Sequence, residues 1–269
     1  MCGPILLDCF NLDKYLLPLV DIKLALFPSK PSFNLIGHPA STKQWKVEIT
    51  DCSLMLCSVT ASAHMVVAHN DLLSRGIPAV YPYTRLESRK LTLSKGINSQ
   101  TFDDIWNGGV PTQVIIALVD NSAANGNYSL NPFNYENFDL NHLSLSLNGE
   151  AIPSKPLKPV YGDSAYKSHY IESYLGLFKG ERDDPLKDTI DITREDFYDG
   201  YCIYRFFLEA ELTDAKENSG VFPTKKSGNM RLDVCFSKAL PKAVDIIVLG
   251  YFPSVMKIDQ YRTVMVSNY

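Results

Sequence analysis

IIALVDNSAANGNYSLNPFNYENFDLNHLSLSLNGEAIPSKPLKP, residues 115–159, is the stretch of this chain that decides its fold. An apolar run at its start ends in Asp120, and a turn-rich segment around Gly126 follows. Leucines then alternate with polar residues over 143–147, up to an Asn-Gly pair at 148–149. Alternation is typical of a half-buried strand, and Asn-Gly favours a two-residue hairpin turn. The stretch therefore predicts antiparallel β structure, and no catalytic group is needed to explain it.

Short phrases in this stretch also carry a family resemblance. Their order resembles the double-jelly-roll (hexon-like) major capsid proteins of adintoviruses and of Polinton/Maverick elements. The phrases are Val119-Asp120-Asn121, Asn125-Gly126, Tyr128, Asn131-Pro132-Phe133-Asn134 and Ile152-Pro153-Ser154-Lys155-Pro156-Leu157. Weaker likenesses extend over residues 11–24, 45–51, 198–201 and 230–236, and the match is poorest over 212–226.

The resemblance implies an N-terminally truncated family member. A full member carries two complete jelly rolls, whereas this chain begins near the end of the first one. Residues 1–44 are then a remnant of the first roll and a linker, with closing strands over 11–24. Residues 45–269 are the second roll, which opens with a strand at 45–51. The expected fold is all-β: a jelly-roll β-sandwich with one or two short helices.

The hydrophobic pattern, taken by itself, agrees with such a fold. It predicts about eight strands in the second roll, long connections and two helices, which suits a jelly roll better than an α/β fold. The predicted helices are 62–73, which Ser62 caps and Gly76 stops, and 166–178. The predicted strands are 21–27 in the remnant and then 47–56, 81–93, 114–119, 143–147, 203–208, 230–236, 244–251 and 261–266.

One sandwich core is expected to unite three of these strands. The residues predicted to be buried in it are Ile115, Leu118, Leu143, Leu145, Ile247 and Leu249. The apolar residues of the remnant, by contrast, are expected to lie exposed because the covering sheet of their roll is missing. These residues are Ile22, Leu24, Leu26 and Phe27.

Composition bounds the class of protein. The chain has 269 residues, of which 45% are hydrophobic, so it can bury a substantial core. Its formal net charge is -4 and it has no basic stretch, which disfavours direct binding to nucleic acid. No run approaches the roughly 18 apolar residues of a membrane span. The N-terminus lacks a secretory layout, so the six cysteines are expected to be reduced and mostly buried: Cys2, Cys9, Cys52, Cys57, Cys202 and Cys235.

Residue types that could carry chemistry have simpler explanations here. His64 and His69 lie five positions apart, which does not give a shared metal-binding face on a helix. They, with His38, His142 and His169, are read as ordinary surface or packing histidines. Asx residues at 120–121 and 125 are read as turn formers rather than as an ion or sugar site.

The acidic residues after position 180 are read as a solvated loop. Their spacing does not fit a calcium loop, and sequence alone cannot pair them as glycosidase carboxylates. They are Glu181, Asp183, Asp184, Asp188 and Asp191. No nucleophile elbow, phosphate loop or dinucleotide motif occurs in the sequence. We therefore predict no catalytic, cofactor-binding or metal-binding residues, and no enzyme activity.

The expected function is structural: a capsid protein, or the remnant of one in an endogenous viral element. The resemblance implies trimeric capsomers, impaired here by truncation, with contacts to other capsid subunits. It implies a place in the virion, or in the cytoplasm or nucleus if a host genome expresses the gene, but not secretion. A carbohydrate-binding β-sandwich, or a β-sandwich hydrolase, is the alternative.

Overall fold

The structure is a computed structural model that describes residues 3–12, 14–37, 45–162, 164, 167–178, 190–208 and 227–268. The chain divides into two compact units. The smaller consists of Met1–Pro28, Gln44–Arg85 and Pro253–Tyr269, and the larger of Ser29–Lys43 and Leu86–Phe252. Each unit is therefore built from segments that are separate in the sequence.

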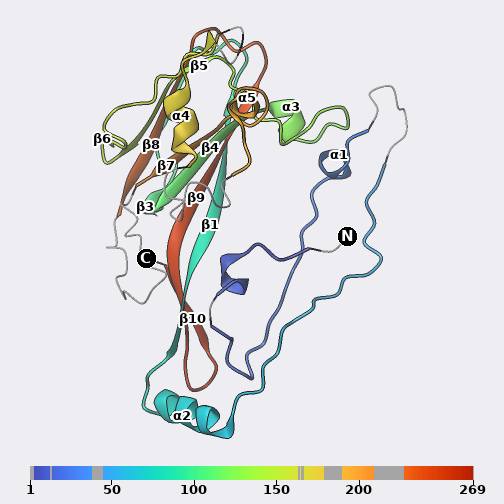
Figure 1. Ribbon diagram of the computed structural model, residues 1–269, viewed down its shortest axis with the longest axis vertical. Coiled ribbons are helices and arrows are strands. Elements are labelled where there is room, and N and C mark those ends of the chain that lie inside the picture. Colours follow the sequence, from blue (N-terminus) through green and yellow to red (C-terminus); the bar gives the residue numbers. More distant parts are fainter. Residues whose placement is uncertain are drawn as a thin grey trace. The chain divides into compact units, whose positions relative to one another are not determined.

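The described strands form two sheets (Figure 1). The first has the order β1-β9-β4-β7, with β10 also paired to β9; the second has the order β2-β8-β5-β6, with β3 also paired to β8. The strands of the first sheet are β1 (Ala79–Leu93), β4 (Gln113–Asp120), β7 (Ile203–Phe207), β9 (Val244–Ile258) and β10 (Val264–Asn268). Those of the second are β2 (Ser99–Phe102), β3 (Asn107–Gly109), β5 (Leu140–Leu147), β6 (Glu150–Ala151) and β8 (Ser227–Phe236).

The strand pairing is nested, and this defines the fold. β1 pairs with β9, β2 and β3 with β8, β4 with β7, and β5 with β6. Pairing thus runs inward from the outermost strands to a central hairpin, and successive pairs alternate between the two sheets. Two sheets wound in this way form a jelly roll. The predicted all-β jelly-roll fold is therefore confirmed, although its opening strand is β1 and not the predicted strand at 45–51.

The central hairpin has the turn that its sequence predicts. Asn148 and Gly149 join β5 to β6 with φ angles of 52° and 89°. A two-residue hairpin turn of type I′ needs positive φ at both positions, which Asn and Gly tolerate best. The strand and hairpin predicted over 143–149 are confirmed.

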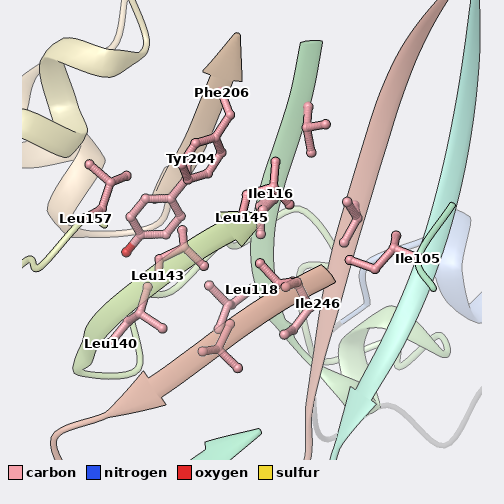
Figure 2. Close-up of a cluster of buried hydrophobic side chains, with 14 of the residues drawn as sticks. Ile105, Ile116, Leu118, Leu140, Leu143, Leu145, Leu157, Tyr204, Phe206 and Ile246 are labelled. Carbon is pink, nitrogen blue, oxygen red and sulfur yellow. The ribbon is translucent and has the colours of Figure 1, made fainter. Parts of the chain in front are cut away.

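The core lies between the two sheets (Figure 2). Fully buried side chains from both sheets meet there, among them Ile116 and Leu118 of β4, Leu143 and Leu145 of β5, Leu232 of β8, and Ile246 and Val248 of β9. Burial of Leu118, Leu143 and Leu145 is as predicted.

Three of the predicted core residues are only partly buried, and for them the prediction was wrong. They are Ile115, Ile247 and Leu249. Ile115 is the register partner of Leu249, and Ile247 that of Ala117, so these residues share the other face of the first sheet. Both strands are apolar on both faces, and such a run does not reveal which of its residues point inward.

Most predicted elements lie close to their expected positions. The helix α2 (Ala63–Ser74) begins after Ser62 and ends before Gly76, whose φ is 80°. The predicted helix 166–178 shrinks to α4 (Ile171–Gly176), because His169 is held in a β-bridge with Val160. Sequence reasoning missed β2, β3 and four short helical segments: a 3₁₀ turn (Asp8–Phe10), α1 (Pro31–Asn34), α3 (Asn121–Ala124) and α5 (Arg194–Tyr198).

Two predicted strands are not formed. Residues 21–27 and 45–61 contain neither helix nor strand, and none of the described strands pairs with them. Their apolar side chains are largely solvent-accessible: Phe27 is 91% exposed and Met55 is 93% exposed. Ile22, Leu24 and Leu26 are exposed as well, as the sequence predicts for residues without a covering sheet.

Adjacent residues of β4 provide a test of the core. Ile116→Ala should lower the free energy of unfolding by about 2–5 kcal/mol, because it leaves a cavity between the sheets. Ile115→Ala, the matched control on the outer face, should cost on the order of 1 kcal/mol. Urea denaturation of both variants measures the difference, and equal losses would contradict the described orientation of β4.

Candidate functional site: the loop that follows β4

A fully buried carboxylate organises the end of the first sheet. The Asp245 side chain in β9 is 0% exposed. Thr92 Oγ1 donates to its Oδ1 at 2.7 Å, and Asn121 Nδ2 donates to the same oxygen at 2.8 Å. Lys90 Nζ lies 2.8 Å from Oδ2. Because a buried charge is stable only when it is paired and hydrogen-bonded, these contacts fix the start of α3 to β1 and β9.

A second, half-exposed group of charges lies at the same end of β4. Lys242 Nζ is 2.9 Å from Asp120 Oδ2 and 3.3 Å from Glu136 Oε1. Burial alone would raise the pKa of Asp120, but Lys242 and the backbone N–H groups of Ser122 and Ala123 bring that pKa below its ordinary value. The Ser122 N–H donates to Asp120 Oδ1 at 2.7 Å and so caps α3. Asp120 is therefore a structural anion that starts the loop.

The loop over residues 121–134, here called the docking loop, is shaped by its own Asn side chains. Asn127 Oδ1 accepts from the Ser129 N–H at 2.9 Å, and Asn131 Oδ1 accepts from the Phe133 N–H at 3.0 Å. Asn125 Nδ2 donates to the Asn121 carbonyl at 2.8 Å. These are the local turns that such residues favour. Of the Asx residues predicted to form turns, Asp120 and Asn125 hydrogen-bond to the backbone of this loop, whereas the Asn121 side chain donates to Asp245 instead.

The docking loop contacts a segment from far upstream, residues 29–37, here called the arm segment (Figure 1). The Gly37 N–H donates to the Tyr128 carbonyl at 2.7 Å. The ring of Phe33 meets that of Phe133 edge to face, with centroids 5.7 Å apart. Gly126, at φ +96°, faces the same segment: a Cβ on it would lie 2.6 Å from Ser32 Oγ. Gly126, Tyr128 and Phe133 belong to the phrases that carry the family resemblance, and here they form one contact surface.

Tyrosines fill the space between β7 and the short helices. Tyr161 Oη lies 2.8 Å from Tyr204 Oη and 3.3 Å from Cys202 Sγ. Burial raises the pKa of the Cys202 thiol to about 11, so the thiol stays neutral and is a poor nucleophile. Burial likewise raises the pKa of Tyr161. Arg205 of β7 donates to the Leu177 carbonyl at 2.9 Å, which holds the end of α4 to the sheet.

A shallow polar depression lies on the second sheet. It is lined by Ser99, Gln100, Thr101, His142, Asp233, Val234 and Cys235. Asp233 accepts from Thr101 Oγ1 at 2.5 Å and from Arg231 Nη2 at 3.0 Å. Burial would raise the pKa of Asp233, but these two hydrogen bonds and the Arg231 charge lower it. The carboxylate is thus held ionised by neighbours within its own sheet.

The structure scatters the histidines and acidic residues considered from the sequence. His64 and His69 are exposed on α2, His142 is half-buried in β5, and His169 is exposed. Asp191 is exposed, while His38, Glu181, Asp183, Asp184 and Asp188 lie outside the described residues. Within the part of the chain that the structure describes, no three His, Cys, Asp or Glu side chains gather closely enough to hold a metal ion.

The cysteines differ from expectation. Cys9, Cys52 and Cys57 are exposed, Cys235 is half-buried and only Cys202, among the five described, is fully buried; all five are free, and Cys2 lies outside the described residues. The prediction of mostly buried thiols was wrong because residues 45–61 form no strand of the core. None of the described helices is both long and apolar enough to cross a membrane.

Sequence reasoning missed the charged residues that organise this site: Lys90, Lys242 and Asp245. Asp245 could have been recognised from the sequence, because it is a charged residue that directly precedes the apolar run Ile246–Leu249. A charge next to a buried run needs a buried partner. Its partners lie on β1 and α3, and only the folded chain brings them together.

No family model matches the chain. A search of curated proteins finds an uncharacterized protein of Caenorhabditis elegans that is 19% identical over 274 aligned residues. The alignment covers 97% of this chain and 61% of that relative, so this chain spans about three fifths of the relative's length.

Solved structures give distant likenesses. The mavirus major capsid protein has a TM-score of 0.35 and 9% identity, over 71% of this chain and 41% of that one. A structure of the Sputnik virophage has a TM-score of 0.33 and 13% identity, over 71% and 39%. PBCV-1 VP54, fitted into a reconstruction of Sputnik, has a TM-score of 0.39 and 13% identity, over 72% and 53%. The jelly-roll fold itself follows from the strand pairing.

Removal of the buried charge should destabilise the protein. Asp245→Asn keeps the side-chain shape but leaves Lys90 without its anion and forces an amide N–H₂ toward Asn121. We expect a loss of about 1–3 kcal/mol in the free energy of unfolding, measured by urea denaturation. Asp139→Asn is the matched control, since its partner Lys238 is 81% exposed; it should change stability by less than about 0.5 kcal/mol.

Asp120 should make stability depend on pH. Its pKa is lower in the folded chain than in the unfolded chain, so its contribution is present above the unfolded value of about 3.9. The contribution is lost as the pH falls through the lower, folded value. The stability difference between the natural chain and Asp120→Asn should therefore shrink below about pH 4. A difference that persists unchanged to about pH 2 would contradict the assigned role of Asp120.

Proposed function

We propose that this chain is a structural protein of the viral capsid type and that it acts by self-association rather than by catalysis. The observation that carries the proposal is the coincidence of fold and phrases. Nested pairing completes one jelly roll between β1 and β9, and the family-like phrases fall at the end of β4, in the β4–β5 connection and just after the β5–β6 hairpin. The phrases and the strand pairing support the same kind of fold.

The finer proposal concerns the kind of capsid protein. The phrases resemble the major capsid proteins of adintoviruses and Polinton/Maverick elements, and we propose an N-terminally truncated relative, such as an endogenous viral-element remnant. Residues 1–44 then correspond to the end of a first roll and a linker, and 45–269 to the second roll. In the family such subunits form trimers in a virion. Expression from a host genome would place this chain in the cytoplasm or nucleus.

The use of polar groups in the fold supports a non-catalytic role. Asp245 has its hydrogen-bonding capacity taken up by Thr92, Asn121 and Lys90. Cys202, the fully buried thiol of the described chain, is kept neutral by burial. Large apolar side chains are instead exposed in the smaller unit, including Leu19 at 87% and Phe27 at 91%. Exposed apolar surface favours association with other protein surfaces.

Light scattering of the purified full chain and of residues 45–269 tests the proposal. We expect the full chain to form irregular oligomers, because Leu26, Phe27 and their neighbours offer unspecific apolar contacts. Removal of residues 1–44 should raise solubility and narrow the size distribution. A uniform trimer from the full chain that is lost on deletion would show that these residues are a working part and not a remnant.

A glycan-array screen of the full chain separates the capsid class from the carbohydrate-binding alternative. We expect no glycan to bind above the level of an unrelated control protein, because a capsid protein need not recognise sugar. A chain that stays monomeric at all concentrations and binds a defined glycan would overturn the capsid proposal.

A further inference from the structure

The arm segment is a self-contained turn. The Leu35 N–H donates to the Pro31 carbonyl at 3.0 Å, which closes α1. Asn34 Nδ2 donates to the Ser29 carbonyl at 3.0 Å, within the same segment. Proline at the first helical position presets the backbone for this turn. The arm segment is therefore a compact turn where it meets the docking loop.

The docking loop fits the arm segment closely at one point and loosely at another. At Gly126 there is no room for even a methyl group, since a Cβ would lie 2.6 Å from Ser32 Oγ and 3.0 Å from Phe33 N. At Phe133, in contrast, the side chain remains 59% exposed although it meets Phe33. The Gly37 hydrogen bond to the Tyr128 carbonyl adds a fixed point at the end of the arm segment.

The described flanks of the arm segment, residues 14–28 and 45–61, contain neither helix nor strand. One flank is attached to β1 of its own chain, where Lys14 Nζ donates to the Val80 carbonyl at 3.3 Å and Tyr81 Oη donates to the Tyr15 carbonyl at 3.1 Å. The flanks join the arm segment to the rest of its chain as a tether. A tether acts on binding through effective concentration and adds no contact at the site.

We propose that the docking loop is an interaction site for the arm segment of a second copy of this chain, so that neighbouring copies exchange arms. The contacts at Gly126, Tyr128 and Phe133 are identical whether the arm segment comes from the same copy or from another. The two arrangements therefore differ in the effective concentration of the arm and in the path of its flanks, and a higher concentration of copies shifts the equilibrium toward exchange. The exchange does not require a closed shell, so it stands or falls separately from the capsid proposal.

Cross-linking between two variants tests the exchange. One copy carries Phe33→Cys and the other Phe133→Cys, both in a background in which Cys2, Cys9, Cys52 and Cys57 are serine. The variants are unfolded, mixed, refolded together at high concentration and treated with a short bifunctional thiol reagent. We expect a cross-linked dimer that contains one copy of each variant. A size tag on one variant distinguishes this dimer from the others on a denaturing gel.

Two controls decide the result. The double variant Phe33→Cys/Phe133→Cys should cross-link within one copy, which shows that the reagent spans the contact. Phe33→Cys mixed with Leu86→Cys, a residue 50% exposed on β1, gives the background of random contact. We expect the matched pair to give several-fold more dimer than this background. Efficient cross-linking within the double variant, with no excess dimer from the matched pair, would overturn the proposal.

A peptide of residues 27–37 provides the second measurement. Added during refolding, it should suppress the cross-linked dimer because it competes for the docking loop, while a peptide of the same residues in scrambled order should not. Dimer that neither peptide reduces would mean that the copies meet elsewhere, and would also overturn arm exchange. Far-ultraviolet circular dichroism of each variant checks that the strands are retained.

Discussion

The antiparallel pairing of β4 with β9 is the interaction on which the rest of the jelly roll depends. It runs without a break from Gln113↔Tyr251 to Asp120↔Val244. β9 also pairs with β1, and β4 with β7, so this one ladder holds the middle of the first sheet together. Both strands are apolar on both faces, because one face meets the second sheet and the other is partly covered. Loss of this ladder would separate the outermost pair of the nested roll from the inner ones.

The polar residues at the end of this ladder extend its order into the loops. Asp245 lies at the end of the ladder and is the point where β1, β9 and the start of α3 converge. Asp120 at the end of β4 caps α3 and pairs with Lys242. The docking loop therefore begins at a rigid point, and its Asn side chains shape the turns that follow. A loop built in this way can present a defined contact surface, here that of Gly126 and Phe133, although it belongs to neither sheet.

Local signals in the sequence were enough for part of this structure. β5 alternates strictly, so both its existence and its inward residues, Leu143 and Leu145, could be predicted. Asn148-Gly149 gave the hairpin, and Gly76 gave the end of α2. In β4 and β9 the apolar run predicted a strand but did not show which of its residues face the core. For this reason Ile115, Ile247 and Leu249 were predicted on the wrong face. β2 and β3 are short and polar or glycine-rich, and they exist only because β8 offers them a partner.

What the sequence could not supply depends on distant partners. Residues 45–61 have apolar residues in alternation, yet a strand needs a neighbour to satisfy its backbone, and none of the described strands pairs with them. Asp245 needs Lys90 and Asn121, which only the nested winding brings to it. The candidate site has the same origin. Gly126 and Phe133 could be recognised as turn residues, but the reason for a glycine at 126 is the backbone of residues 32–33.

The same physics connects the fold to its proposed role. In the larger unit, the side chains between the sheets are buried, and the buried Asp245 carboxylate is paired with Lys90. In the smaller unit, apolar side chains such as Leu19, Phe27 and Met55 remain exposed. A chain that uses polar groups to fix its own loops, and that still exposes apolar surface, is well equipped for contact with other chains. Self-association therefore requires no group that the fold has not already placed.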